Sequence, residues 1–203
     1  MSGTAPRQAG RRRHDVGPRE RVLRAAGELF YAEGIGAVGV DRLRDAADVA
    51  KSTIYDYFGS KDDVVAAYLA HRSSQWRAHL QVVLDATDPT PRAQLRAVFG
   101  ALGRWFAEPG FRGCPFINAV AELPDPSHPA VPVAAQHRAW VLELLTQIAR
   151  EAGARDPEPL GRQFALLYDA SMTTAQATGS AQAAIDAAAA ADTLLVAEIS
   201  AGR

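Results

Sequence analysis

Residues 38–58 read VGVDRLRDAADVAKSTIYDYF. The spacing of apolar residues predicts two short amphipathic helices, 40–47 and 51–58, joined by a three-residue turn, which is the pattern of a helix-turn-helix. A small shared core is expected where the two helices meet, formed by Leu43, Ala47, Val49, Ile54 and Phe58.

The opposite face of the second helix carries a cation, hydroxyls and phenols, on Lys51, Ser52, Thr53, Tyr55 and Tyr57. These groups hydrogen-bond to phosphates and base edges, and a single helix is narrow enough to enter the major groove of DNA. The pattern therefore favours DNA binding, although a tight helix pair in any α-domain has a similar polar outside.

The rest of the chain predicts an all-α fold, because it is rich in alanine and lacks runs of alternating apolar and β-branched residues. A helix is expected from Pro18 to the glycines at 34 and 36, and Ser60 is the expected N-cap of a long helix reaching about Leu84. Prolines and glycines separate the later helices, which are predicted near 95–106, 116–123, 134–153, 160–178 and 181–200.

Composition narrows the class of protein further. The chain has 203 residues, of which 48% are hydrophobic, and no stretch is apolar enough to span a membrane, so a cytoplasmic protein is expected. Its one cysteine, Cys114, excludes a disulfide framework and a cysteine-built zinc site. Up to Lys61 the chain carries eleven basic and eight acidic residues, whereas the remainder is net acidic, which indicates a polyanion partner at the N-terminal end.

Residues 20–69 resemble the DNA-binding domain of the tetracycline-repressor (TetR) family. In that family a helix ending in Phe and Gly precedes the helix-turn-helix, whose second helix reads Thr-Leu-Tyr-x-His/Tyr-Phe and is followed by a Lys at the start of the next helix. The aromatic, turn and lysine positions keep their spacing here, at Leu29, Phe30, Gly34, Leu43, Ala47, Val49, residues 53–58, Ser60, Lys61 and Val64.

The resemblance implies a DNA-binding transcriptional regulator, a repressor released from a palindromic operator by a small, mainly apolar ligand. It implies a basic disordered tail over 1–17, a three-helix DNA-binding domain over 18–64, and a helical domain over 65–203 that binds the ligand and forms a homodimer. Two departures affect the first domain: Asp48 replaces the turn glycine, and Val38 and Gly39 replace the usual Thr or Ser before the second helix.

Residue roles follow from the same resemblance. Lys51, Ser52 and Thr53 are expected nearest the base edges, and Tyr55 and Tyr57 at phosphates. Lys61 is expected to hold a phosphate together with the free N–H groups of its helix. The tail arginines, Arg11, Arg12 and Arg13, either follow the DNA backbone or minor groove or remain solvated.

Two stripes on the last two helices favour a dimer interface, with the alternative that they face the chain's own core. The first contains Leu167 and Met172, and the second contains Ile185 and Val196. The expected ligand pocket lies among aromatic and polar residues, with the alternative that these are internal packing and internal hydrogen bonds. The expected ligand-binding residues are Trp105, Phe106, Phe116, Asn118, His137, Trp140, Tyr168 and Met172.

The segment 112–122, RGCPFINAVAE, resembles one found in a subgroup of these regulators and hints at a shared pocket shape. Cys114 within it is either a redox sensor or a small buried hydrophobe. Glu122 is a further candidate for orienting a ligand.

Two other classes of protein stay open at this stage. An enzyme is disfavoured, because the five histidines show no metal-ligand spacing and there is no glycine-rich phosphate loop or nucleophile elbow, so no catalytic residue, metal or cofactor is expected. An architectural DNA-binding protein is disfavoured because it needs no long acidic α-domain.

Overall fold

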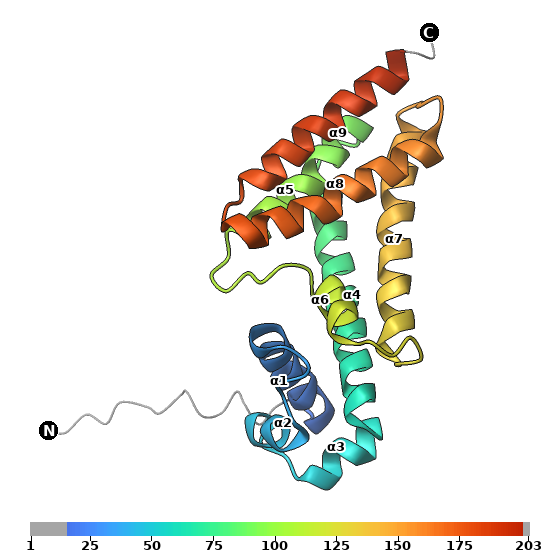
Figure 1. The fold of residues 1–203 in the computed structure, drawn as a ribbon. Helices are drawn as coiled ribbons and strands as arrows, with labels where there is room; N and C mark the ends of the chain where they lie inside the picture. Colours follow the sequence, from blue (N-terminus) through green and yellow to red (C-terminus); the bar gives the residue numbers. More distant parts are fainter. Residues whose placement is uncertain (1–15, 201–203) are drawn as a thin grey trace, which may run out of the picture.

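The structure is a computed structural model that describes residues 16–200, and within that range it is built from α-helices with no strand. The predicted all-α fold is confirmed (Figure 1). The tail arginines Arg11, Arg12 and Arg13 lie outside the described residues.

Three helices at the N-terminal end form a small module: α1 (Pro18–Glu33), α2 (Val40–Ala47) and α3 (Lys51–Phe58). The bounds of α2 and α3 are those predicted, and one residue from each helix anchors the shared core, because Val22, Leu43 and Ile54 are all completely buried. Apolar residues at helical spacing therefore position α3 with its polar face outward.

The turn of the helix-turn-helix is held by a contact from α1. Asp48 ends α2 in the left-handed conformation, with φ 52°, and is the only residue other than glycine with positive φ among residues 16–200. Arg21 of α1 donates from Nε to the carbonyl of Ala47 (3.1 Å) and from Nη2 to that of Asp48 (3.3 Å). These two bonds satisfy carbonyls at the end of α2 and offset part of the strain at Asp48.

Helix α4 (Lys61–Asp85) connects this module to the rest of the molecule. Ser60 is its N-cap, as predicted, and accepts a hydrogen bond from the backbone N–H of Asp63 at 3.0 Å. The N-terminal half of α4 packs on α1, where the rings of Phe30 and Tyr68 meet edge to face with centroids 5.7 Å apart. The C-terminal half of α4 enters the larger helical body (Figure 1).

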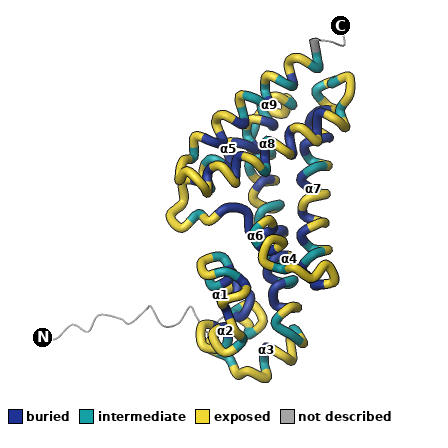
Figure 2. The backbone as a smooth tube through the Cα atoms, in the orientation of Figure 1, coloured by how far each residue is buried: buried dark blue, intermediate teal, exposed yellow. Residues whose placement is uncertain are grey.

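The body contains α5 (Pro91–Phe106), α6 (Pro115–Glu122), α7 (Ala130–Glu151), α8 (Pro157–Thr178) and α9 (Gln182–Ser200). Helix α8 packs along α7 and α9, and α9 also packs along α5, and buried residues lie where these helices face one another (Figure 2). Asp192 of α9 forms ion pairs with Arg92 and Arg96 of α5, which link these two helices at the surface of the body. The hydrogen bond from Arg92 is the main cause that lowers the pKa of Asp192 to about 2.

Three helices begin three or more residues earlier than predicted. Helix α5 starts at Pro91 rather than 95, α7 at Ala130 rather than 134, and α8 at Pro157 rather than 160. In each case a proline that was interpreted as a helix breaker lies in the first turn, where a backbone N–H would have no intrahelical partner.

Candidate functional site

Helix α3 presents the polar face expected from the sequence. Lys51, Ser52, Tyr55 and Tyr57 are exposed and Thr53 is partly buried. Tyr55 and Tyr57 are 43% and 51% exposed, which is unusual for large aromatic side chains that have no partner to cover them. The face therefore combines a cation, hydroxyls and phenols on one helix, a set suited to phosphates and base edges.

The charges around α3 are mixed. Lys51 pairs with Asp41 of α2 at 3.1 Å, and Arg44 pairs with Asp45 at 2.6 Å. Exposed ion pairs such as these contribute little stability, so a DNA phosphate can replace the carboxylate as partner of Lys51 at small cost.

Lys61 stands at the first position of α4, but its side chain turns back toward the end of α1. Its Nζ donates to the carbonyl of Ile35 at 2.8 Å. Asp62 and Asp63 occupy the same first turn, and Ser60 already caps the N–H of Asp63. An ammonium group has three donors, so Lys61 retains capacity for a phosphate, and its predicted role stays a prediction.

The turn after α1 is also held from the body by α6. The Oε2 atom of Glu122 accepts from the backbone N–H of Ile35 at 2.7 Å and of Gly36 at 3.1 Å. Gly34 has φ 91°, and a Cβ at this position would lie 3.1 Å from the same carboxylate oxygen. Glu122 therefore joins the body to the N-terminal module, rather than lining the cavity described below.

A second link lies at the other end of α6. The hydroxyl of Tyr31 in α1 donates to the carbonyl of Gly113 at 3.0 Å and accepts from the N–H of Arg112 at 2.8 Å. Arg112 and Gly113 immediately precede Cys114, which lines the cavity. Helix α1 and the turn that follows it therefore contact both ends of the segment 112–122.

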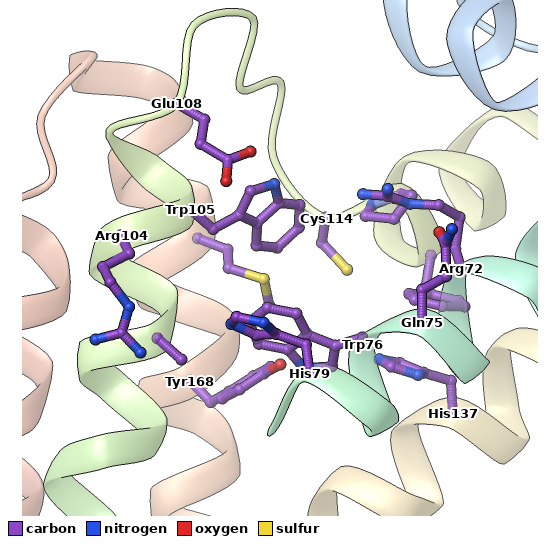
Figure 3. A pocket seen from close by; sticks show the side chains of 14 residues that line it. Arg72, Gln75, Trp76, His79, Arg104, Trp105, Glu108, Cys114, His137 and Tyr168 are labelled. Carbon is purple, nitrogen blue, oxygen red and sulfur yellow. The ribbon is translucent and has the colours of Figure 1, made fainter. Parts of the chain in front are cut away.

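A cavity of about 330 Å³ opens among α4, α5, α6, α7 and α8 (Figure 3). Its size is at the small end of pockets that hold organic ligands. The buried side chains that form its floor are Ala101, Cys114, Pro115, Phe116, His137, Tyr168 and Met172, and the exposed ones at its rim are Gln75, His79, Arg104 and Glu108.

Five of the eight expected ligand-binding residues line this cavity: Trp105, Phe116, His137, Tyr168 and Met172. The other three are placed elsewhere. Phe106 is in the core against Phe111, Asn118 donates to the carbonyl of Arg112 at 2.8 Å, and Trp140 lies under the guanidinium of Arg77. Their helices border the cavity, but the rotation of each helix about its axis turns these side chains away.

The sequence analysis missed the contribution of α4. Arg72, Gln75, Trp76 and His79 all line the cavity and recur at the spacing of one helical face. That spacing was visible in the sequence, but a face mixing a tryptophan with polar residues does not register as an apolar stripe.

Two titratable groups on the floor are held neutral. Burial, and to a smaller extent the charge of Arg77, lowers the pKa of His137 to about 4. Burial raises the pKa of the Cys114 thiol to about 11. A thiol held in this form is a poor nucleophile, which favours the small-hydrophobe interpretation of Cys114 over the redox-sensor one.

The apolar stripes on α8 and α9, which were expected to form a dimer interface, contain both buried and exposed residues. Met172 is buried within the chain and Leu167 is partly buried, whereas Leu166 of α8 is 63% exposed and Ile185 and Val196 of α9 are 62% and 44% exposed. The outward surface of α8 and α9 is therefore apolar at positions that the chain itself does not cover.

Residues 16–200 contain no cluster of His, Cys, Asp or Glu able to hold a metal ion. None of the helices in this range is long and apolar enough to cross a membrane.

Comparison with known proteins identifies relatives of this chain. The sequence model of the family described as "Bacterial regulatory proteins, tetR family" matches residues 22–68. The crystal structure of a TetR-family transcriptional regulator from Streptomyces coelicolor superimposes with a TM-score of 0.84 at 34% identity, covering 90% of this chain and 96% of that one.

Two curated relatives come from Escherichia coli K12. The HTH-type transcriptional regulator YjdC is 26% identical over 154 residues, covering 74% of this chain and 79% of its own. The HTH-type transcriptional repressor NemR is 26% identical over 135 residues, covering 66% and 67%.

Proposed function

The chain belongs to the TetR family of DNA-binding transcriptional regulators, and from this premise we propose that it is a repressor released from its operator by a small, mainly apolar ligand. The relative NemR is named a transcriptional repressor, which supports the direction of regulation. The observation that carries the proposal is that α4 begins at the DNA-binding module and lines the cavity farther along its length.

In this proposal residues 18–64 bind DNA and residues 65–203 bind ligand and dimerise, after a basic tail over 1–17. The boundary falls inside α4, which is one continuous helix, so a displacement at the cavity reaches the DNA-binding module without crossing a flexible linker. Lys51, Ser52 and Thr53 contact base edges, Tyr55 and Tyr57 contact phosphates, and Lys61 contacts a phosphate near the start of α4.

The functional unit is a homodimer formed through α8 and α9. Leu166, Ile185 and Val196 supply the exposed apolar surface, and the small residues between them let helices approach closely. Two α3 helices related by twofold symmetry then read a palindrome whose half-sites lie about one helical turn, roughly 34 Å, apart.

Ligand and DNA are linked through the separation of the two α3 helices. A ligand that prefers a separation mismatched to the groove repeat weakens DNA binding, and DNA weakens ligand binding by the same factor. The coupling expected for such a switch is about 1–3 kcal/mol. Residues 113–118, GCPFIN, place Cys114 and Phe116 on the cavity floor, which supports a pocket shape shared with the subgroup that carries this segment.

The test is an anisotropy titration of the full chain with labelled DNA from upstream of its own gene, alongside a scrambled duplex of equal length and composition. The proposal expects the upstream duplex to bind at least about a thousandfold more tightly than the scrambled one, within the usual specific-to-non-specific ratio. It also expects transcription from that promoter to rise when the gene is deleted. Equal affinity for both duplexes contradicts specific binding, and a fall in transcription contradicts repression while leaving DNA binding intact.

A further inference from the structure

Aromatic rings line much of the cavity. The indoles of Trp76 and Trp105 meet with centroids 5.5 Å apart, and the ring of Phe116 stacks on the imidazole of His137 with centroids 3.7 Å apart. Walls of this kind favour planar aromatic molecules, which pack against ring faces with little loss of internal freedom.

Tyr168 of α8 brings a hydroxyl to this floor. The residue is only 3% exposed, yet none of the hydrogen bonds formed among residues 16–200 involves its hydroxyl. Burial raises its pKa well above the ordinary value, with a partly offsetting influence from the nearby indole N–H of Trp76. The hydroxyl is therefore protonated, and it can donate a hydrogen bond to an acceptor placed in the cavity (Figure 3).

The indole of Trp76 supplies a second free donor. Its Nε1 is buried, forms no hydrogen bond that meets the geometric criteria within residues 16–200, and lies near the hydroxyl of Tyr168. Leaving a buried N–H without an acceptor costs about 1–3 kcal/mol, so a ligand that supplies one recovers that cost.

His137 of α7 supplies a third hydrogen-bond donor. Its Nδ1 lies 3.0 Å from the hydroxyl oxygen of Ser73, and that oxygen already accepts from Nε of Arg77 at 3.2 Å. With Arg77 already donating to this oxygen, we assign the Ser73 hydroxyl as the donor to Nδ1. We assign the neutral tautomer with its proton on Nε2, because the pKa of His137 is lowered to about 4.

The floor thus offers donors but no charge. The charged side chains that line the cavity are Arg104 and Glu108 at the exposed rim and the half-buried Arg72, whose guanidinium stacks over the ring of Tyr31. A carboxylate buried beside Tyr168 and His137 would have no positive partner on the floor, and burying an unpaired charge is far more costly than burying a neutral oxygen.

From this arrangement we infer that the ligand is a neutral, planar, bicyclic or tricyclic aromatic molecule whose carbonyl oxygen accepts hydrogen bonds from Tyr168, Trp76 and His137. The inference rests on the proposed function, since it names the ligand class of the same cavity. A carbonyl oxygen has two lone pairs, so it engages at most two of these donors strongly at once.

Isothermal titration calorimetry of the full chain tests the inference with three probes of similar size. Chromone is a neutral bicyclic ketone, naphthalene has the same ring count without an acceptor, and 1-naphthoate carries a carboxylate. Chromone is expected to bind about tenfold more tightly than either of the others, because a site with buried donors discriminates against ligands that leave them unpaired.

The Tyr168→Phe variant separates the hydrogen bond from the aromatic packing. This variant is expected to bind chromone about three- to tenfold more weakly and to bind naphthalene with unchanged affinity. Tyr68→Phe is the matched control, because it removes a buried phenol hydroxyl of α4 outside this cavity and should change neither affinity.

Three results overturn the inference: failure of chromone to bind, equal binding of chromone and naphthalene, or strongest binding of 1-naphthoate. None of these depends on DNA, so each leaves the repressor proposal standing. Conversely, strong chromone binding with an unaltered DNA affinity supports the ligand class and contradicts the switch.

Discussion

Replacing Glu122 by Gln tests whether α6 holds the turn after α1. Oε2 of Glu122 accepts from the N–H groups of Ile35 and Gly36, at 2.7 and 3.1 Å. Hydrogen bonds to a charged acceptor contribute about 1.5–3 kcal/mol, against about 0.5–1.5 kcal/mol for a neutral one. Loss of the charge therefore costs about 1 kcal/mol at the buried Ile35 amide, and less at Gly36, because that residue is exposed and screened by water.

Amide hydrogen exchange by NMR measures this cost at the two positions concerned. A loss of about 1 kcal/mol corresponds to about fivefold faster exchange at Ile35, with a smaller change at Gly36. Glu28→Gln is the control, since it removes the same charge from an exposed position on α1. Unchanged exchange at Ile35 in Glu122→Gln would refute the role of Glu122 as a link between body and module.

Further predictions concern packing, pH and DNA contact. Gly161→Ala should destabilise the chain by at least about 2 kcal/mol in urea unfolding, because the added Cβ overlaps Thr146 and lies 2.8 Å from its Cα. His137 has a folded pKa of about 4, below that of the unfolded chain, so its stabilising contribution is complete above pH 6.5 and is lost as the pH falls toward 4. The slope in this window should be about 1 kcal/mol per pH unit, and His137→Asn should remove it. Lys61→Ala should weaken binding to all duplexes alike and reduce the slope of log K against log salt by about one, whereas a change in sequence preference instead would argue against a phosphate contact.

The N-terminal module was predictable because local patterns determine it. Leu43 and Ile54 fall on facing sides of two short helices, and Ser60 has the cap geometry its sequence context indicates. The early starts of α5, α7 and α8 were missed because proline was read as a breaker, although in a first turn it is well tolerated.

The cavity was only partly predictable because side-chain direction depends on tertiary packing. Trp105 and Phe106 are adjacent on α5, yet only the first faces the cavity. Trp76 was missed for the same reason, since nothing local to α4 indicates which face of the helix lines the cavity. Glu122 was expected to orient a ligand, but its carboxylate instead accepts from the N–H groups of Ile35 and Gly36, which lie more than eighty residues away in the sequence, so no local pattern indicated this contact.

The central claim is that ligand binding in the cavity and DNA binding are thermodynamically linked. It is tested by titrating the chain with upstream DNA, with and without a saturating concentration of one probe. The probe is whichever of chromone, naphthalene and 1-naphthoate binds most tightly. A coupling of about 1–3 kcal/mol predicts that the probe raises the dissociation constant for DNA by about 5- to 150-fold. DNA should raise the dissociation constant of the probe by the same factor. A DNA affinity that is the same with the cavity filled and empty would contradict the account.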